Sequence, residues 1–383
     1  MQFYLDHHAT TPLAPEVRDA MTPLWSEAFG NPASVEHGRG LAAADRVDRA
    51  RAQVAQSLGA EAREIVFTSG ATEANNMAVL GAARFRKKFE GRDEVLVFAA
   101  EHSCVLGAAK SLVDDGFRVQ TLPMKPDGKA DIDALKNALN DRVALVSLML
   151  ANNEIGTLQP MHQVSALAHE VGAWVHTDAA QAAGKVPIDV RELDLDLLSL
   201  SGHKIYGPMG VGALFVRRRP RVRLEPLMHG GGQERGLRAG TLPLPLVAGL
   251  GEALALAQDR MSADAAQQSA LREVLLQQLA ETPVEFVVNG CMTDRLPGNL
   301  SLSFPNISRE SLFSAMADAG IAVSSGSACS SHEIAPSHVL TSLGLEPLLA
   351  QQTLRIGFGR SSGPDHVAAL VSAVLAAHQK QGC

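Results

Sequence analysis

Lys204 and Asp178 are the two residues of this 383-residue chain whose types and positions best predict chemistry. Lys204 follows an apolar run at residues 195–200, which is typical of a buried strand. A desolvated lysine loses its charge easily, and the neutral amine forms a Schiff base with an aldehyde. Asp178 ends an earlier strand-like run at residues 173–177. A carboxylate there can hold a pyridinium nitrogen, so the pair predicts pyridoxal phosphate at the strand ends of an α/β fold.

A phosphate site is predicted where a short β-branched and aromatic run at residues 65–68 is followed by small polar residues and then by helix formers. This order indicates a strand, a tight turn and a helix N-terminus near Ala71 and Thr72. Free backbone N–H groups and the helix dipole favour a phosphate there. The alternative is an ordinary helix capped by the side chain of Ser69 or Thr72.

An ordered series of motifs runs nearly the whole length of the chain. The motifs lie at residues 4–12 (YLDHHATTP), 30–34 (GNPAS), 65–76 (IVFTSGATEANN), 101–102 (EH), 152–156 (NNEIG), 176–181 (HTDAAQ), 201–204 (SGHK), 229–235 (HGGGQER), 238–241 (RAGT) and 324–329 (SSGSAC). With these motifs, the sequence resembles the cysteine desulfurases of the class V aminotransferase family, in the branch of the housekeeping iron–sulfur and nitrogen-fixation enzymes.

Alternating apolar runs and helical stretches from about residue 45 to 255 predict a mostly parallel sheet that is covered on both faces. The resemblance implies an α/β fold of the pyridoxal-phosphate-dependent transferase type (fold type I, aspartate aminotransferase-like). We expect a large cofactor-binding domain at residues 13–255. Residues 1–12 together with 256–383 should form a smaller α+β domain that carries a catalytic cysteine. The stretch 248–279 predicts long helices, and 284–288 and 300–304 predict strands.

The resemblance also implies the catalytic groups. Lys204 would bind the cofactor covalently and move the α-proton of the substrate. His102 would stack on the cofactor ring and exchange a proton with the substrate thiol. Cys329 would attack the substrate sulfur, and its small, polar surroundings at residues 324–331 favour an accessible thiol.

The remaining expected site residues bind cofactor and substrate, again by resemblance. Asp178 would keep the ring nitrogen protonated, and Gln181 would bond the ring hydroxyl oxygen. Asn153 and Arg355 would bind the substrate carboxylate, for which a guanidinium is well suited. The phosphate would be held by Ala71, Thr72, Ser201 and His203, with Thr241 supplied by the second subunit of a homodimer.

Three other cysteines compete with Cys329 for the nucleophilic role. Cys104 is better explained as a small buried filler, Cys291 follows an Asn-Gly turn signal, and Cys383 is the last residue. The four cysteines are scattered, so neither a disulfide framework nor a metal site is expected.

The predicted activity is conversion of L-cysteine to L-alanine with a persulfide left on Cys329. The sulfur would pass to an acceptor protein, which could be an iron–sulfur scaffold, a tRNA-thiolation relay or part of another pathway such as DNA phosphorothioation. A selenocysteine lyase or another class V enzyme is the alternative, and a non-catalytic binding protein is a third class that intact Lys204, Asp178 and Cys329 disfavour.

The overall composition agrees with an enzyme of this kind. The net charge of −7 gives no electrostatic reason to expect direct nucleic-acid binding. The apolar runs are too short to span a membrane, and residues 1–6 have no signal-peptide character, so we expect a cytoplasmic protein. The basic run at residues 217–221 is interpreted as a solvated turn, with docking of an acidic partner as the alternative.

Overall fold

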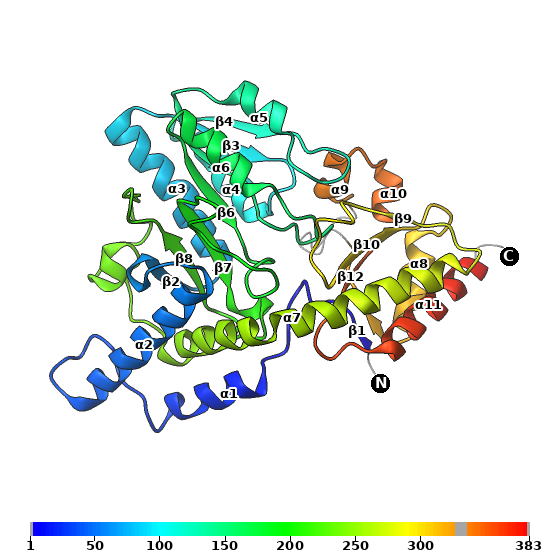
Figure 1. Ribbon diagram of the computed structural model, residues 1–383, viewed down its shortest axis with the longest axis horizontal. Coiled ribbons are helices and arrows are strands. Elements are labelled where there is room, and N and C mark those ends of the chain that lie inside the picture. Colours follow the sequence, from blue (N-terminus) through cyan, green and yellow to red (C-terminus); the bar gives the residue numbers. More distant parts are fainter. Residues whose placement is uncertain (1–2, 326–334, 381–383) are drawn as a thin grey trace.

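A seven-stranded sheet forms the centre of the computed structural model, which describes residues 3–325 and 335–380 (Figure 1). Its strands lie in the order β2-β8-β7-β6-β5-β3-β4, and β8 runs antiparallel to both of its neighbours while the other pairs are parallel. The strands are β2 (Ile65–Thr68), β3 (Glu94–Phe98), β4 (Arg118–Leu122), β5 (Val143–Ser147), β6 (Trp174–Asp178), β7 (Leu197–Ser201) and β8 (Gly212–Val216).

Helices bury both faces of this sheet. Successive strand residues point to opposite faces, so Ile65 and Phe67 join one apolar cluster while Val66 joins the other. The first cluster is covered by α1 (Pro15–Met21), α2 (Gly38–Ser57), α5 (Ile132–Ala138), α6 (Met161–Glu170) and the start of α7 (Leu244–Ala280); the second is covered by α3 (Ala71–Glu90) and α4 (Ser103–Ser111). Burial on both sides explains why the strands read as continuous apolar runs.

A third apolar cluster belongs to the C-terminal part of the chain and includes Leu5. Its antiparallel sheet has the order β12-β10-β9, and a separate parallel pair joins β1 to β11. The elements are β1 (Phe3–Tyr4), β9 (Val287–Val288), β10 (Asn299–Ser303), α8 (Arg309–Asp318), β11 (Ile321–Ala322), α9 (His338–Ser342), α10 (Pro347–Gln351), β12 (Thr353–Gly357) and α11 (Pro364–Gln379). Short 3₁₀ turns complete the list at Thr22–Trp25, Ala62–Glu64, Gly202–Lys204 and Gln233–Gly236.

The predicted fold class is confirmed by this architecture. The stretch 248–279 lies within the single long helix α7, which runs beside both parts of the molecule (Figure 1). The strand expected at residues 284–288 is shorter than predicted, because only Val287–Val288 pairs with β10. The division into domains at residue 255 stays a prediction, and that junction falls inside α7.

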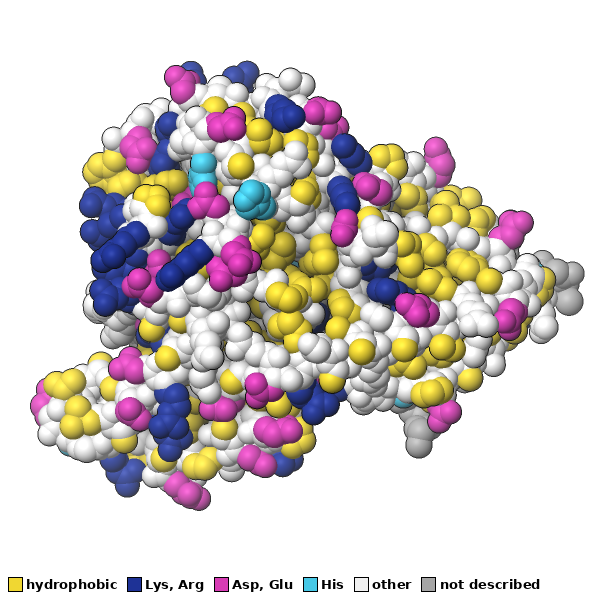
Figure 2. All heavy atoms as spheres, in the orientation of Figure 1, with side chains coloured by type: hydrophobic (Ala, Val, Ile, Leu, Met, Phe, Trp, Pro, Cys, Tyr) yellow, Lys and Arg dark blue, Asp and Glu magenta, His cyan; other side chains and the backbone are white. Residues whose placement is uncertain are grey.

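Lys and Arg side chains gather on one side of the face seen in Figure 2. The basic run contributes to a groove lined by several arginines, and its Arg218 and Arg219 are exposed as expected for a solvated turn. Arg217 is instead paired with Asp194 across 2.6 Å. Among the described residues, no helix is long and apolar enough to cross a membrane.

Candidate active site

A cavity of about 620 Å³ opens beyond the carboxyl ends of the parallel strands. Parallel strands bring their carboxyl ends to one edge of a sheet, which is where α/β folds bind ligands. Ten of the residues predicted from the sequence line this cavity: Ala71, Thr72, His102, Asn153, Asp178, Gln181, Ser201, His203, Lys204 and Arg355.

The N-terminus of α3 opens into the cavity. Its N-cap is Gly70, with φ of +154° and no side-chain cap, so the alternative of a helix capped by Ser69 or Thr72 is wrong. No atom lies within 4 Å of the place a Cβ would take on Gly70, so the approach to the helix end is open. Ala71 and Thr72 line the cavity here, and His203 Nδ1 lies 3.1 Å from Thr10 Oγ1. An uncapped N-terminus of a long helix fits a phosphate group.

Asp178 is held in a fixed orientation at the end of β6. Its Oδ2 accepts a hydrogen bond from Asn75 Nδ2 at 2.6 Å, and its Oδ1 accepts one from the backbone N–H of Ala180 at 2.8 Å. The carboxylate group is almost fully buried yet borders the cavity. Asn75 was not singled out from the sequence, although it lies one helical turn after Ala71 and therefore on the same face of α3.

Lys204 ends the short turn after β7. Its amine donates hydrogen bonds to the backbone oxygens of His8, at 2.6 Å, and Ala9, at 2.7 Å. The N-terminal segment thus forms one wall of the cavity, next to the lysine that is expected to bind the cofactor.

His102 is the N-cap residue of α4, and its tautomer follows from its contacts. Its Nδ1 accepts a hydrogen bond from the backbone N–H of Cys104 at 3.2 Å, so the proton of the neutral ring is on Nε2. Burial lowers the pKa of His102, which favours that neutral form. Burial also raises the pKa of the Cys104 thiol to about 12. Cys104 borders the cavity as a neutral thiol and is a poor nucleophile at neutral pH.

Arg355 connects the C-terminal part of the chain to the N-terminal segment. It lies in β12, and its guanidinium forms an ion pair with Asp6 across 2.9 Å. Asp6 in turn accepts a hydrogen bond from Ser324 Oγ at 2.6 Å, and the backbone oxygen of Asn153 lies 3.4 Å from Arg355 Nη1. The buried Nε of Arg355 has no hydrogen-bond partner among the described residues. Arg355 also lines the open cavity, and a guanidinium in that place fits a carboxylate ligand.

Glu101 is a buried carboxyl group that sequence reasoning did not select. It is fully buried, and its Oε1 accepts a hydrogen bond from the backbone N–H of Met149 at 2.5 Å. Burial and the nearby Asp178 raise the pKa of Glu101 to about 8, so the group is neutral at pH 7.

Two predicted site residues need separate mention. Cys329 lies outside the described residues, as does Cys383. Thr241 is exposed and borders a separate groove that includes Asn31 and Arg51, so the structure does not bring it to the cavity of its own chain.

The described part of the site fits pyridoxal phosphate. It combines an open helix N-terminus for a phosphate, a fixed buried carboxylate for a ring nitrogen and a lysine amine for an aldehyde. Among the described residues no cluster of metal-ligating side chains is found.

Comparison with known proteins identifies the family. The sequence profile of the family described as "Aminotransferase class-V" matches residues 3–370. The chain is 47% identical over 360 residues to "Cysteine desulfurase IscS" of Rickettsia bellii, and the match covers 94% of this chain and 87% of that protein.

Solved structures agree with this relationship. One described as "NIFS-LIKE PROTEIN" superposes with a TM-score of 0.90 at 34% identity and covers 98% of both chains. Another, "SspA in complex with cysteine", gives a TM-score of 0.82 at 36% identity, covering 94% of this chain and 99% of that one. The chain therefore belongs to the class V aminotransferase family and is a cysteine desulfurase that uses pyridoxal phosphate.

Proposed function

We propose that this enzyme converts L-cysteine to L-alanine and leaves the released sulfur as a persulfide on Cys329. The observation that carries the proposal is the convergence of Lys204, Asp178 and His102 on one cavity at the strand ends. The related structure of SspA, described in complex with cysteine, supports L-cysteine as the substrate.

Each described residue would have a distinct task. Bound pyridoxal phosphate supplies an aldehyde that condenses with amines and a ring that withdraws electrons from the substrate. Asp178, fixed by Asn75, would keep a proton on the ring nitrogen. Lys204 would hold the cofactor and, once the substrate amine has displaced it, would move a proton at the α-carbon.

The other contacts would orient the substrate and handle its thiol. Arg355 and Asn153 would bind the substrate carboxylate, with Arg355 released in part from Asp6. His102 carries its proton on Nε2, and exchange of a proton with the substrate thiol is the role we assign to that atom.

The electrons of the sulfur transfer balance, so the step needs no external oxidant or reductant. The Cys329 thiolate attacks the substrate sulfur, so an S–S bond forms while the substrate C–S bond breaks. The electron pair of the C–S bond stays with carbon, which takes up a proton and leaves as alanine. The transferred sulfur is oxidised to the persulfide level, and the carbon is reduced by the same two electrons.

We further propose a cytoplasmic homodimer that delivers this sulfur to an acceptor protein for iron–sulfur assembly or thiolation. Thr241 would reach the cofactor phosphate of the partner subunit. Its exposed position, in a groove away from its own cavity, is consistent with that role. A closed two-fold dimer meets this requirement with one self-complementary interface.

Mass analysis after a single turnover tests the proposal. Wild-type protein incubated with L-cysteine should yield alanine and a Cys329 peptide that is one sulfur atom heavier. Cys329→Ser should bind cofactor and substrate but form no protein persulfide, because a hydroxyl group cannot accept the sulfur. Cys104→Ser is the matched control and should keep the persulfide. Persulfide formation that survives Cys329→Ser and disappears in Cys104→Ser would overturn the assignment.

A further inference from the structure

Cys104 is a half-buried cysteine that borders the cofactor cavity and has no part in the proposed reaction. It is the second residue of α4, and His102 is the N-cap of the same helix. Its sulfur lies 3.0 Å from His102 Nδ1 and 3.2 Å from Asn75 Nδ2. The side chain of Thr72 also forms a hydrogen bond with this cysteine. Three side chains around the expected cofactor site therefore meet at one thiol.

The directions of these hydrogen bonds follow from the donors around the sulfur. The Asn75 amide has two hydrogens, of which one is donated to Asp178 Oδ2 at 2.6 Å and the other to the sulfur. An amide N–H can only donate, so the sulfur is the acceptor in that contact. The Nδ1 atom of His102 accepts the backbone N–H of Cys104 and therefore carries no hydrogen of its own. The thiol hydrogen is thus donated to Nδ1.

The protonation states of Cys104 and His102 agree with this direction. Burial and the nearby Asp178 raise the pKa of the Cys104 thiol to about 12, so the sulfur keeps its hydrogen at pH 7. Burial lowers the pKa of His102, which keeps the ring neutral. The opposite arrangement, a thiolate beside an imidazolium, is typical of nucleophilic cysteines. Here it would place a buried negative charge close to the Asp178 carboxylate.

The other charged and titratable groups that face His102 act on it from a distance. Asp178 opposes the effect of burial on the His102 pKa, whereas Lys204 and His338 act in the same direction as burial. These three groups come from the end of β6, the turn after β7 and the start of α9. Each acts through its charge, whereas Cys104 is hydrogen-bonded to one particular ring nitrogen. Only a bond of that kind distinguishes Nδ1 from Nε2.

We propose that Cys104 is a positioning residue that holds the His102 ring with Nδ1 turned toward α4 and with its Nε2–H available to the cavity. Two donors from one residue, the backbone N–H and the thiol, converge on Nδ1. A ring rotated by half a turn would bring a carbon atom to these donors and lose both bonds. The same sulfur joins His102 to Asn75, which orients Asp178. This inference rests on the proposed role of His102 at the substrate thiol.

NMR spectroscopy of the full-length apoprotein tests the inference without any turnover. Isotope-labelled histidine in a deuterated protein reports the tautomer and the pKa of each ring, and His102→Gln identifies the signals of His102. In the wild type, the neutral His102 ring should carry its hydrogen on Nε2 and should titrate below the ordinary histidine value of about 6.5. A hydrogen on Nδ1 of the neutral ring would overturn the proposal without any further variant.

Two substitutions separate the hydrogen bond of Cys104 from the volume of its side chain. Cys104→Val fills the same space without a donor, and it should raise the His102 pKa by about half a unit to one unit. Cys104→Ser keeps a donor and should leave the His102 titration close to that of the wild type. The serine hydroxyl replaces the thiol donor, so persulfide formation should also persist in that variant. Cys291→Val, at a cysteine whose sulfur lies 3.2 Å from Thr293 Oγ1, is the control and should change nothing.

Cys104→Ala gives the same comparison if the branched valine side chain disturbs α4, because alanine also lacks a donor. Two outcomes would contradict the inference: an unchanged His102 titration in both Cys104→Val and Cys104→Ala, or a shift in Cys104→Ser that equals theirs. Failure of the proposed function is a separate result. If His102→Gln still formed alanine at the wild-type rate, His102 would have no role at the substrate thiol, whatever its titration curve.

Discussion

The side-chain amide of Asn75 donates a hydrogen bond to Asp178 Oδ2 across 2.6 Å and so joins α3 to the end of β6. The same amide lies 3.2 Å from Cys104 Sγ. One side chain on α3 therefore orients the carboxylate that we assign to the ring nitrogen.

We expect Asn75→Ala to weaken pyridoxal phosphate binding. A hydrogen bond to a charged group contributes about 1.5–3 kcal/mol, so the dissociation constant should rise about ten- to a hundredfold. Equilibrium dialysis with the cofactor measures this. Asn76→Ala, one residue along the helix and bonded only to the backbone of Thr72 in the described contacts, is the control. Equal losses in the two variants would point to a general disturbance of α3.

Arg355→Lys should raise KM for L-cysteine far more than it lowers kcat. An ammonium cannot make the paired, planar contact of a guanidinium with a carboxylate. The lost hydrogen bond to a charged group predicts an increase in KM of about tenfold or more. Steady-state alanine formation gives both constants, and Arg84→Lys, in an exposed ion pair with Asp115, serves as the control. An unchanged KM would remove Arg355 from substrate binding.

Glu101 should make folding stability fall as pH rises. Its folded-state pKa of about 8 is above its ordinary value of 4.5, so the folded protein keeps a proton that the unfolded chain releases. This stabilising contribution is complete below pH 4.5 and is lost progressively as the pH approaches 8. Glu101→Gln cannot release that proton, and its stability should depend less on pH.

Denaturant unfolding of the wild type and Glu101→Gln at pH 5.5 and pH 8 measures this difference. The variant should gain stability relative to the wild type at the higher pH. The comparison removes the contribution of other titrating groups, since both proteins share them. Parallel pH dependences would show that Glu101 is already ionised at neutral pH.

We expect the protein to be a dimer, and we expect Thr241→Ala to weaken its retention of the cofactor. Loss of one hydrogen bond to a phosphate predicts a cost on the order of 1.5–3 kcal/mol. Light scattering of the wild type gives the oligomeric state, and dialysis gives cofactor retention. Thr22→Ala, at the C-cap of α1, is a control for threonine loss at the surface. A fully active monomer would rule out a site built from two subunits.

The sequence alone determined the sheet and the main residues of the cavity. Continuous apolar runs show strands buried on both faces, and polar residues at their ends identify Asp178 and Lys204. Because parallel strands end at the same edge of a sheet, Asp178 and Lys204 were expected to lie close together. The motif series indicated the remaining site residues through the family resemblance.

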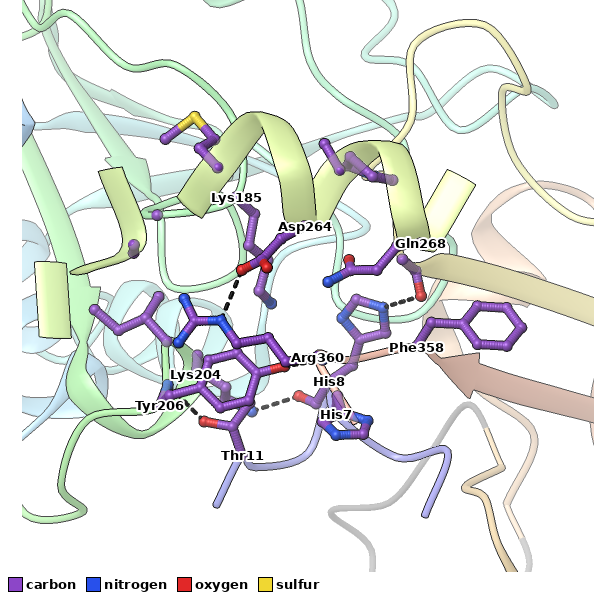
Figure 3. Close-up of a pocket in the computed structure, with 17 residues that line it drawn as sticks. His7, His8, Thr11, Lys185, Lys204, Tyr206, Asp264, Gln268, Phe358 and Arg360 are labelled. Atoms are coloured by element: carbon purple, nitrogen blue, oxygen red, sulfur yellow. Dashed lines mark hydrogen bonds and ion pairs between the residues drawn. The ribbon is translucent and has the colours of Figure 1, made fainter. Parts of the chain in front are cut away.

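Only the tertiary structure decided which distant groups became partners. Asp6 and Arg355 are 349 positions apart, and the pattern around either residue says nothing about the other. Lys185 lies four residues after Gln181 and donates a hydrogen bond to its side chain, but the cavity that Lys185 and Lys204 both line (Figure 3) depends on where α7 and the N-terminal segment pack. The same holds for Glu101, whose altered pKa results from desolvation and from Asp178. Charge and protonation depend on all the atoms around a group, and packing brings those atoms from the whole chain.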